Sequence, residues 1–185
     1  MIDNATDIVK EIILRQKDIN IAVDMTAGNG YDSKFILDKL NPRKLLAFDI
    51  QKKAQENTEK LIGQRENFQF ILDSHENIDK YIKEKVDLVI YNLGYLPKGD
   101  KSITTKWQST IKSLEKSIDL ISEKGKIIIT VYPGHKEGAE EARWLEKYLK
   151  NLDYQKFNVL KVNYINKINN PPYTYIIGIR NDFAE

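Results

Sequence analysis

The stretch that decides the fold is residues 21–32, Ile-Ala-Val-Asp-Met-Thr-Ala-Gly-Asn-Gly-Tyr-Asp. An apolar run ends at Asp24, and a turn of small residues that contains Gly28 and Gly30 follows. Glycine permits positive φ and lets a ligand approach the backbone closely. A helix that begins after such a turn points its free N–H groups at the bound ligand. The stretch therefore predicts a strand, a ligand-binding turn and a helix.

Outward from this stretch, strand-like and helix-like segments alternate. Apolar runs predict buried strands at residues 19–23, 44–48, 68–72, 86–91 and 126–131. Periodic segments predict helices at 3–16, 32–40, 52–62, 103–122 and 137–149, with Gly125 as the stop signal of the fourth. Two final strands, 157–164 and 173–179, are joined by a turn-rich segment that suits an antiparallel pair. We predict an α/β fold with a seven-stranded, mostly parallel sheet, helices on both faces and an antiparallel C-terminal strand pair.

Composition narrows the class of protein. The 185 residues suit a single domain, 1–185, and the absence of cysteine excludes disulfides and thiolate metal sites. The two histidines are far apart, so we expect no metal. We find neither a signal-peptide core nor an apolar run of about 20 residues, so we expect a cytoplasmic protein without a membrane segment.

Charge is unevenly distributed along the chain. Residues 1–80 hold 12 Lys and Arg against 14 Asp and Glu, whereas residues 81–185 hold 17 against 13. The second part could offer phosphates a mildly positive face, or it could present an ordinary solvated lysine-rich surface.

Three acids follow expected strands, where ligands of such sheets bind. Asp49 lies 19 residues after Gly30, a position from which a carboxylate binds ribose hydroxyls; it could instead cap the next helix. Asp24 would repel the pyrophosphate of a dinucleotide but attract the ammonium group of a methionine moiety. The turn therefore favours S-adenosylmethionine over NAD. Asp73 could accept a hydrogen bond from the adenine amino group, or cap the helix that follows it.

Asn92 opens the sequence Asn-Leu-Gly-Tyr-Leu-Pro, residues 92–97, after the fourth expected strand. This segment resembles the (Asp/Asn)-Pro-Pro-(Tyr/Phe) element of amino-methylating enzymes, with leucine and glycine in place of the prolines. In that element the polar side chain accepts hydrogen bonds from the target amine and aims its lone pair at the methyl group. An aliphatic amine must first lose a proton, for which His135 and Asp32 are candidates.

Five motifs occur in an order that resembles a known family. They are Asp24-x-Thr26-x-Gly-Asn-Gly30-x-Asp32, Asp73-Ser-His75, the segment 92–105, Tyr132-x-Gly-His135, and Asn169-Asn-Pro-Pro172. Together they resemble the bacterial family described as rRNA methylases. Its characterised members use S-adenosylmethionine to convert 5-aminomethyl-2-thiouridine, at the tRNA wobble position, to 5-methylaminomethyl-2-thiouridine. The resemblance covers nearly the whole chain and implies a class I Rossmann-like methyltransferase, a homodimer, and the tRNA anticodon stem-loop as partner.

The resemblance also implies roles for individual residues. With the acid and glycines of the turn included, the predicted cofactor-binding residues are Asp24, Gly28, Asn29, Gly30, Asp32, Asp49, Gln51, Asp73 and His75. The predicted substrate-binding residues are Leu93, Gly94, Tyr95, Lys98, Lys101 and Thr105, and the predicted catalytic residues are Asn92, Tyr132 and His135. Pro133 departs from the family pattern, which expects a polar residue there.

Other functions stay open at this point. The same fold could methylate rRNA or a small amine, because the sequence lacks a separate RNA-binding domain. A catalytically silent nucleotide-binding or RNA-binding module is a second alternative, although the two cofactor acids and Asn92 argue against it. An NAD oxidoreductase is disfavoured by Asp24 and by the lack of a second substrate domain.

Overall fold

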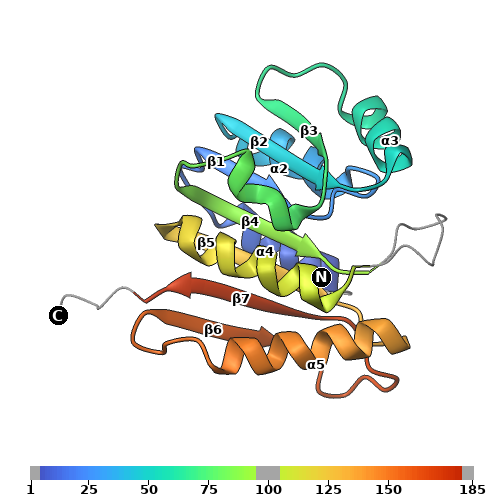
Figure 1. Ribbon diagram of the computed structural model, residues 1–185, viewed down its shortest axis with the longest axis vertical. Coiled ribbons are helices and arrows are strands. Elements are labelled where there is room, and N and C mark those ends of the chain that lie inside the picture. The colour runs from blue at the N-terminus through green and yellow to red at the C-terminus, as the bar shows by residue number, and fades with distance from the viewer. Residues whose placement is uncertain (1–4, 95–104, 181–185) are drawn as a thin grey trace.

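A seven-stranded sheet lies between two layers of helices in the computed structural model, which describes residues 5–94 and 105–180 (Figure 1). The strand order is β3-β2-β1-β4-β5-β7-β6. Neighbours among β1 to β5 pair in parallel, and β7 runs antiparallel to both β5 and β6. The predicted sheet is thus confirmed. Its strands are β1 (Ile21–Asp24), β2 (Lys44–Asp49), β3 (Phe68–Leu72), β4 (Val86–Asn92), β5 (Ile121–Val131), β6 (Phe157–Val162) and β7 (Tyr173–Ile179).

The helices divide between the two faces because the central strands are apolar on both sides. In β1, Ala22 belongs to one buried cluster, whereas Ile21 and Val23 belong to the other, as the two-residue period of a strand requires. One cluster contains residues of α1, α2 and α3, and the other contains residues of η1, α4 and α5. The helices are α1 (Ala5–Leu14), α2 (Tyr31–Leu40), α3 (Lys52–Ile62), the 3₁₀ helix η1 (His75–Lys80), α4 (Trp107–Leu120) and α5 (Lys136–Lys150).

One predicted boundary is wrong. Gly125 does not stop a helix, because α4 ends at Leu120 and β5 begins at the next residue. The pairing of β4 with β5 shifts register between Val86 and Leu88, and Gly125 lies in the strand beside this irregularity. A Cβ at Gly125 would lie 2.8 Å from the Ile121 side chain and 2.9 Å from the Val86 carbonyl oxygen. The close approach of β4 and β5 explains why residue 125 is a glycine. The predicted start of the fourth helix, at residue 103, lies outside the described residues.

The topology places the carboxyl ends of β1 and β4 side by side in the middle of the sheet. The chain moves outward from β1 to β3 on one side and returns to β4 on the other, so this is the point where the strand order switches. Ligands of open α/β sheets bind outside the strand ends at such a point. Across residues 5–94 and 105–180, no helix is both long and apolar enough to cross a membrane.

Candidate functional site

The glycine turn joins β1 to α2 and is fixed by two neighbouring elements. Gly28 and Gly30 have φ of 54° and 80°, which explains why glycine occupies both positions. The Gly28 N–H donates to Asp49 Oδ2 (3.0 Å) at the end of β2, and Thr58 Oγ1 of α3 donates to the Gly28 carbonyl (3.1 Å). A Cβ at Gly30 would lie 2.8 Å from the Thr58 methyl group. Gly30 therefore permits close packing of the turn on α3.

Asp24 is a buried carboxylate at the end of β1, with 1% of its surface exposed. It accepts hydrogen bonds from the Thr26 N–H (3.1 Å) and from Ser33 Oγ (2.6 Å). Burial, together with the negative charge of Asp32 nearby, raises its pKa from 3.8 to about 7. Such a carboxyl is poised to meet a cation, because an adjacent positive charge would restore its ionised form. Sequence reasoning missed Ser33, whose only signal is its place one turn into the helix after the glycines.

Asp49 belongs to the turn as well as to β2. Its second oxygen accepts from the Gln51 N–H (2.9 Å), and burial raises its pKa. Gln51, not Asp49, occupies the N-cap position of α3. Asp49 therefore does not cap this helix. Asn29 of the turn accepts a hydrogen bond from Asn57 Nδ2 of α3 (2.8 Å). These contacts place Asp24, Asp49 and the glycine turn around the ends of two adjacent strands.

Asn92 ends β4 beside this turn. Its backbone N–H donates to Thr26 Oγ1 (2.7 Å), and its side-chain Nδ2 donates to Asp32 Oδ2 (3.2 Å). Asp24 pairs with Ile90 across the β1–β4 ladder, so Asp24 and Asn92 point to the same face of the sheet. Asp32, in the first turn of α2, meets them from above that face, and burial raises its pKa. The structure thus brings together predicted residues from two separate motifs, the glycine turn and the segment that begins at Asn92.

A small cavity of about 10 Å³ lies between Asp32, Asn92, Thr6 and Thr130, with room for about one water molecule. The Tyr132 hydroxyl is hydrogen-bonded to Thr6 and Asn92, two of the residues that line this cavity. Burial raises the pKa of Tyr132, so its hydroxyl stays protonated at neutral pH. Thr6 was not predicted, because nothing in the sequence of α1 indicates a contact with the end of β5.

Asp73 and His75 lie at the end of β3. The Asp73 carboxylate accepts from Asn77 Nδ2 (3.0 Å) and from the Tyr81 hydroxyl (2.8 Å), which fastens it to η1. The His75 ring is buried edge-on against Tyr91, and burial lowers its pKa to about 4, so it is neutral at pH 7. Within the described residues, His75 Nδ1 has no hydrogen-bond partner. Binding of the cofactor by Asp73 and His75 stays a prediction.

The remaining predicted residues fall into three groups. His135 is the N-cap of α5, where its Nδ1 accepts from the Gly138 N–H (3.0 Å). The Leu93 side chain is fully buried in the core, so only its backbone can face a substrate. The Thr105 N–H donates a hydrogen bond to the Gly94 carbonyl. Tyr95, Lys98 and Lys101 lie outside the described residues. No group of three or more His, Asp or Glu side chains suited to a metal ion occurs in the part of the chain that the structure describes.

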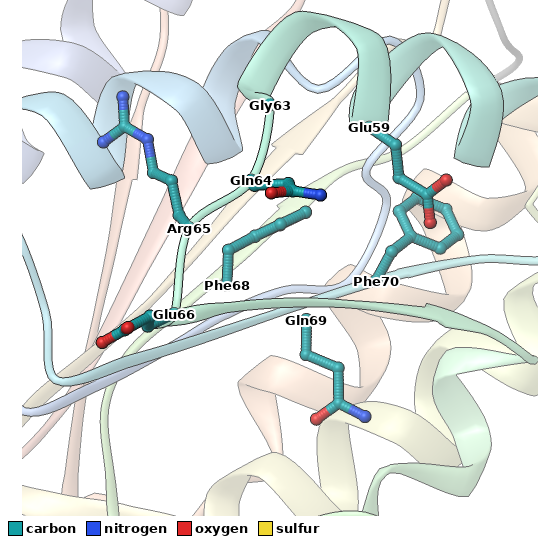
Figure 2. A pocket seen from close by; sticks show the side chains of 8 residues that line it. All are labelled: Glu59, Gly63, Gln64, Arg65, Glu66, Phe68, Gln69 and Phe70. Atoms are coloured by element: carbon teal, nitrogen blue, oxygen red, sulfur yellow. The ribbon is translucent and has the colours of Figure 1, made fainter.

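A larger hollow of about 720 Å³ lies elsewhere, between the end of α3 and the start of β3 (Figure 2). Phe68, Phe70, Glu59 and Gln64 are among its lining side chains (Figure 2). Because β3 runs parallel to β1, β2 and β4, the start of β3 lies at the edge of the sheet opposite the strand ends. The hollow is therefore separate from the acids and from Asn92, which lie at the strand ends where ligands of such sheets bind.

Comparison with known proteins finds one family and several similar structures. The family model described as "Putative rRNA methylase" matches residues 45–178. A Clostridium thermocellum structure, described as a "putative rRNA-methylase", is 36% identical with a TM-score of 0.93, covering 97% of this chain and 100% of that one. A Streptococcus mutans structure, described as a "putative methyltransferase" in complex with SAH, is 32% identical with a TM-score of 0.88 and the same coverage.

One plant protein that is similar to this chain is named for a particular tRNA methylation. The Arabidopsis thaliana protein named "tRNA (mnm(5)s(2)U34)-methyltransferase, chloroplastic" is 29% identical over 174 residues. The match covers 86% of this chain and 63% of the plant protein. The chain thus spans less than two thirds of that relative's length.

Proposed function

This chain belongs to the rRNA methylase family, and we propose that it methylates tRNA with S-adenosylmethionine. The reaction converts 5-aminomethyl-2-thiouridine at the wobble position to 5-methylaminomethyl-2-thiouridine. The observation that carries this proposal is the contact between Asn92 and Asp32 at the switch point of the sheet. It places an amide that can orient an amine beside a carboxylate that can take its proton, next to the glycine turn.

The residues of the turn fit S-adenosylmethionine. When bound, this cofactor supplies a methyl group on a positively charged sulfur. Asp24 is buried and would gain from a neighbouring ammonium group, because a cation relieves the penalty that burial imposes on its charge. The Asp49 carboxylate at the end of β2 suits ribose hydroxyls. Both would hold the cofactor at the end of β1, beside Asn92.

The orientation of the Asn92 amide follows from the chemistry of its neighbour. An ionised carboxylate only accepts hydrogen bonds, so the Asn92 NH₂ group must face Asp32. The Asn92 carbonyl oxygen is then left to accept from an N–H of the substrate amine. That bond fixes the direction of the nitrogen lone pair, and correct positioning supplies most of the rate enhancement in such a displacement.

Asp32 is the better supported of the two candidates for the base. It touches Asn92 and lines the small cavity, and burial raises its pKa toward the range in which a carboxylate accepts a proton. His135 instead uses Nδ1 to cap α5. Asp32 would accept the proton of the substrate ammonium, and the neutral amine would then be free to take the methyl group that S-adenosylmethionine supplies.

The tRNA substrate is supported by the name of the plant relative and by the charge of the chain. The relative is named for the wobble base of tRNA, at 29% identity. The residues after 80 carry the excess of lysine and arginine, which favours an RNA partner. A flipped wobble base would stack on aromatic rings such as that of Tyr132. The homodimer stays a prediction, which light scattering of the purified protein would test.

The test is a methylation assay with bulk tRNA from cells that lack the enzyme. Purified protein and labelled S-adenosylmethionine are incubated with the tRNA, and the nucleosides are identified by mass spectrometry. We expect the methylaminomethyl nucleoside to appear as its aminomethyl precursor disappears. Cofactor binding without any change in the tRNA nucleosides would refute the tRNA substrate and favour rRNA or a small amine.

An Asn92→Ala variant tests the central residue. It removes the acceptor for the amine, so we expect turnover to fall by about 100-fold while the affinity for S-adenosylmethionine is kept. Asn158→Ala, which changes an exposed asparagine of β6, is the matched control and should leave turnover unchanged. Wild-type turnover in Asn92→Ala would exclude this role for the amide.

A further inference from the structure

A buried carboxylate on α5 lies outside every motif discussed so far. Glu141 has 3% of its surface exposed, and each of its oxygens accepts a hydrogen bond from a threonine hydroxyl. Thr105 donates to Oε2 (2.8 Å) and Thr110 donates to Oε1 (2.6 Å). Burial raises the pKa of Glu141, so its placement inside the protein carries a cost. The contacts that it makes therefore indicate what it does.

Thr105 connects this carboxylate to the segment that follows Asn92. The Thr105 N–H donates to the Gly94 carbonyl (3.0 Å), and the Gly94 N–H donates to Thr105 Oγ1 (3.1 Å). A hydroxyl has one proton to donate, and the Thr105 hydroxyl donates it to Glu141 in a hydrogen bond. The lone pairs of Thr105 Oγ1 are therefore directed to the Gly94 N–H. Glu141 fixes the rotation of this hydroxyl and, through it, the position of Gly94.

Three successive N–H groups are held in this way, each by a different element. The Asn92 N–H donates to Thr26 Oγ1 (2.7 Å) in the turn after β1, and the Leu93 N–H donates to the Thr130 carbonyl (2.9 Å) of β5. Gly94 is the third, with a φ of 149°, in the left-handed half of conformational space that favours glycine. These three hydrogen bonds together hold the backbone of residues 92–94, and Glu141 contacts the acceptor of the third, Thr105 Oγ1.

We propose that Glu141 is a positioning residue for methyl transfer. It locks the Thr105 hydroxyl onto Gly94 and so holds residues 92–94 in the conformation that aims the Asn92 amide at the amine. This inference rests on the role of Asn92 in the proposed function. Glu141 touches neither substrate nor cofactor in this role, so its removal should lower kcat and leave the affinity for S-adenosylmethionine as it is.

The test compares variants that cut the connection at different points. Glu141→Ala and Thr105→Val should each lower kcat by about 10- to 100-fold, because a small misplacement of the amide is enough to slow the reaction. The double variant should lose no more than the stronger single variant, because both act through one hydrogen bond. Thr110→Val removes the other hydrogen bond of Glu141 and should lower the melting temperature without lowering kcat. Glu141→Gln, which keeps the shape and one acceptor, should recover part of the loss.

Hydrogen exchange gives a readout that is independent of activity. The Gly94 amide should exchange faster in Glu141→Ala and in Thr105→Val than in the wild type and in Thr110→Val. If Glu141→Ala does not fold, the comparison of Thr105→Val with Thr110→Val carries the test. Wild-type kcat in Glu141→Ala, an equal loss in Thr110→Val, or unchanged exchange at Gly94 would overturn the inference. Failure of the wild type to methylate the tRNA would instead refute the proposed function.

Discussion

Replacement of Asp24 by asparagine should stabilise the protein in the absence of ligand. Asparagine has nearly the same shape as aspartate, so its oxygen can still accept from the Thr26 N–H and its NH₂ group can donate to Ser33 Oγ. The substitution therefore removes the charge and keeps both contacts. What it removes is the cost of holding a carboxylate in a site with 1% exposure beside Asp32.

The size and sign of the effect follow from the pKa. A pKa raised from 3.8 to about 7 means that the folded protein binds the Asp24 proton more tightly than the unfolded chain does. Below about pH 4 both states hold the proton and the penalty is absent; it grows as the pH rises to 7 and is constant above that. At about 1.4 kcal/mol for each pH unit, the penalty reaches about 4 kcal/mol above pH 7. The advantage of Asp24→Asn should thus grow by about 2–3 kcal/mol between about pH 5 and pH 8.

Urea denaturation of wild type and Asp24→Asn at these two pH values measures this difference. Asp38→Asn is the control, and it should change the free energy of unfolding in the opposite direction. Lys34 and Arg65 lower the pKa of Asp38, so its ion pairs stabilise the protein above about pH 4, and the variant should be less stable than wild type at both pH values. The same Asp24 variant should bind S-adenosylmethionine more weakly, since it can no longer attract the ammonium group. An Asp24→Asn advantage that does not change with pH would refute the reasoning, because it would mean that Asp24 is already ionised in the folded protein.

Two further predictions concern stability. Gly30→Ala should lower the free energy of unfolding by about 1–3 kcal/mol more than Gly63→Ala, because both glycines have positive φ but only the Cβ at residue 30 would meet Thr58; chemical denaturation of both variants decides this. Glu146 has a pKa lowered to about 2 by hydrogen bonds from Lys150 and Lys161, so Glu146→Gln should be less stable than wild type at pH 7. This difference should shrink below about pH 4.5 and disappear as the pH falls through 2, as melting temperatures across this range would reveal.

The strands of the parallel part of the sheet were predictable because their signals are local. Parallel strands buried on both faces are continuous apolar runs, and β1 to β4 therefore lie within one or two residues of their predicted positions. The start of β5 was not predictable, since the stripe that indicates α4 continues through Ile121 into the strand. There the pairing of β5 with Val86 overrides the helical pattern. The cost of a Cβ at Gly125 also comes from a neighbouring strand, which the sequence around the glycine does not reveal.

The site was predictable only where strand ends mark it. Asp24, Asp49 and Asn92 each terminate a strand, so the convergence of parallel strands brings them together. Glu141 and Thr105 are hydrogen-bonded across 36 residues of sequence, and neither terminates a strand. Their contact exists only because α5 packs beside α4, a tertiary arrangement that no local pattern encodes.

The β1–β4 ladder couples the positions of Asp24 and Asn92, the residues proposed for the cofactor and for the substrate. Because Asp24 pairs with Ile90, a shift of one residue in this register would turn Asn92 to the other face, away from Asp32. The face toward α1 and α2 therefore supplies the chemical groups. The opposite side supplies the support, since the Leu93 side chain enters the other core and Glu141 holds Gly94 through Thr105. A reactive amide placed between two independently packed layers is fixed from both, so mutations on α5 can alter catalysis without touching the cofactor.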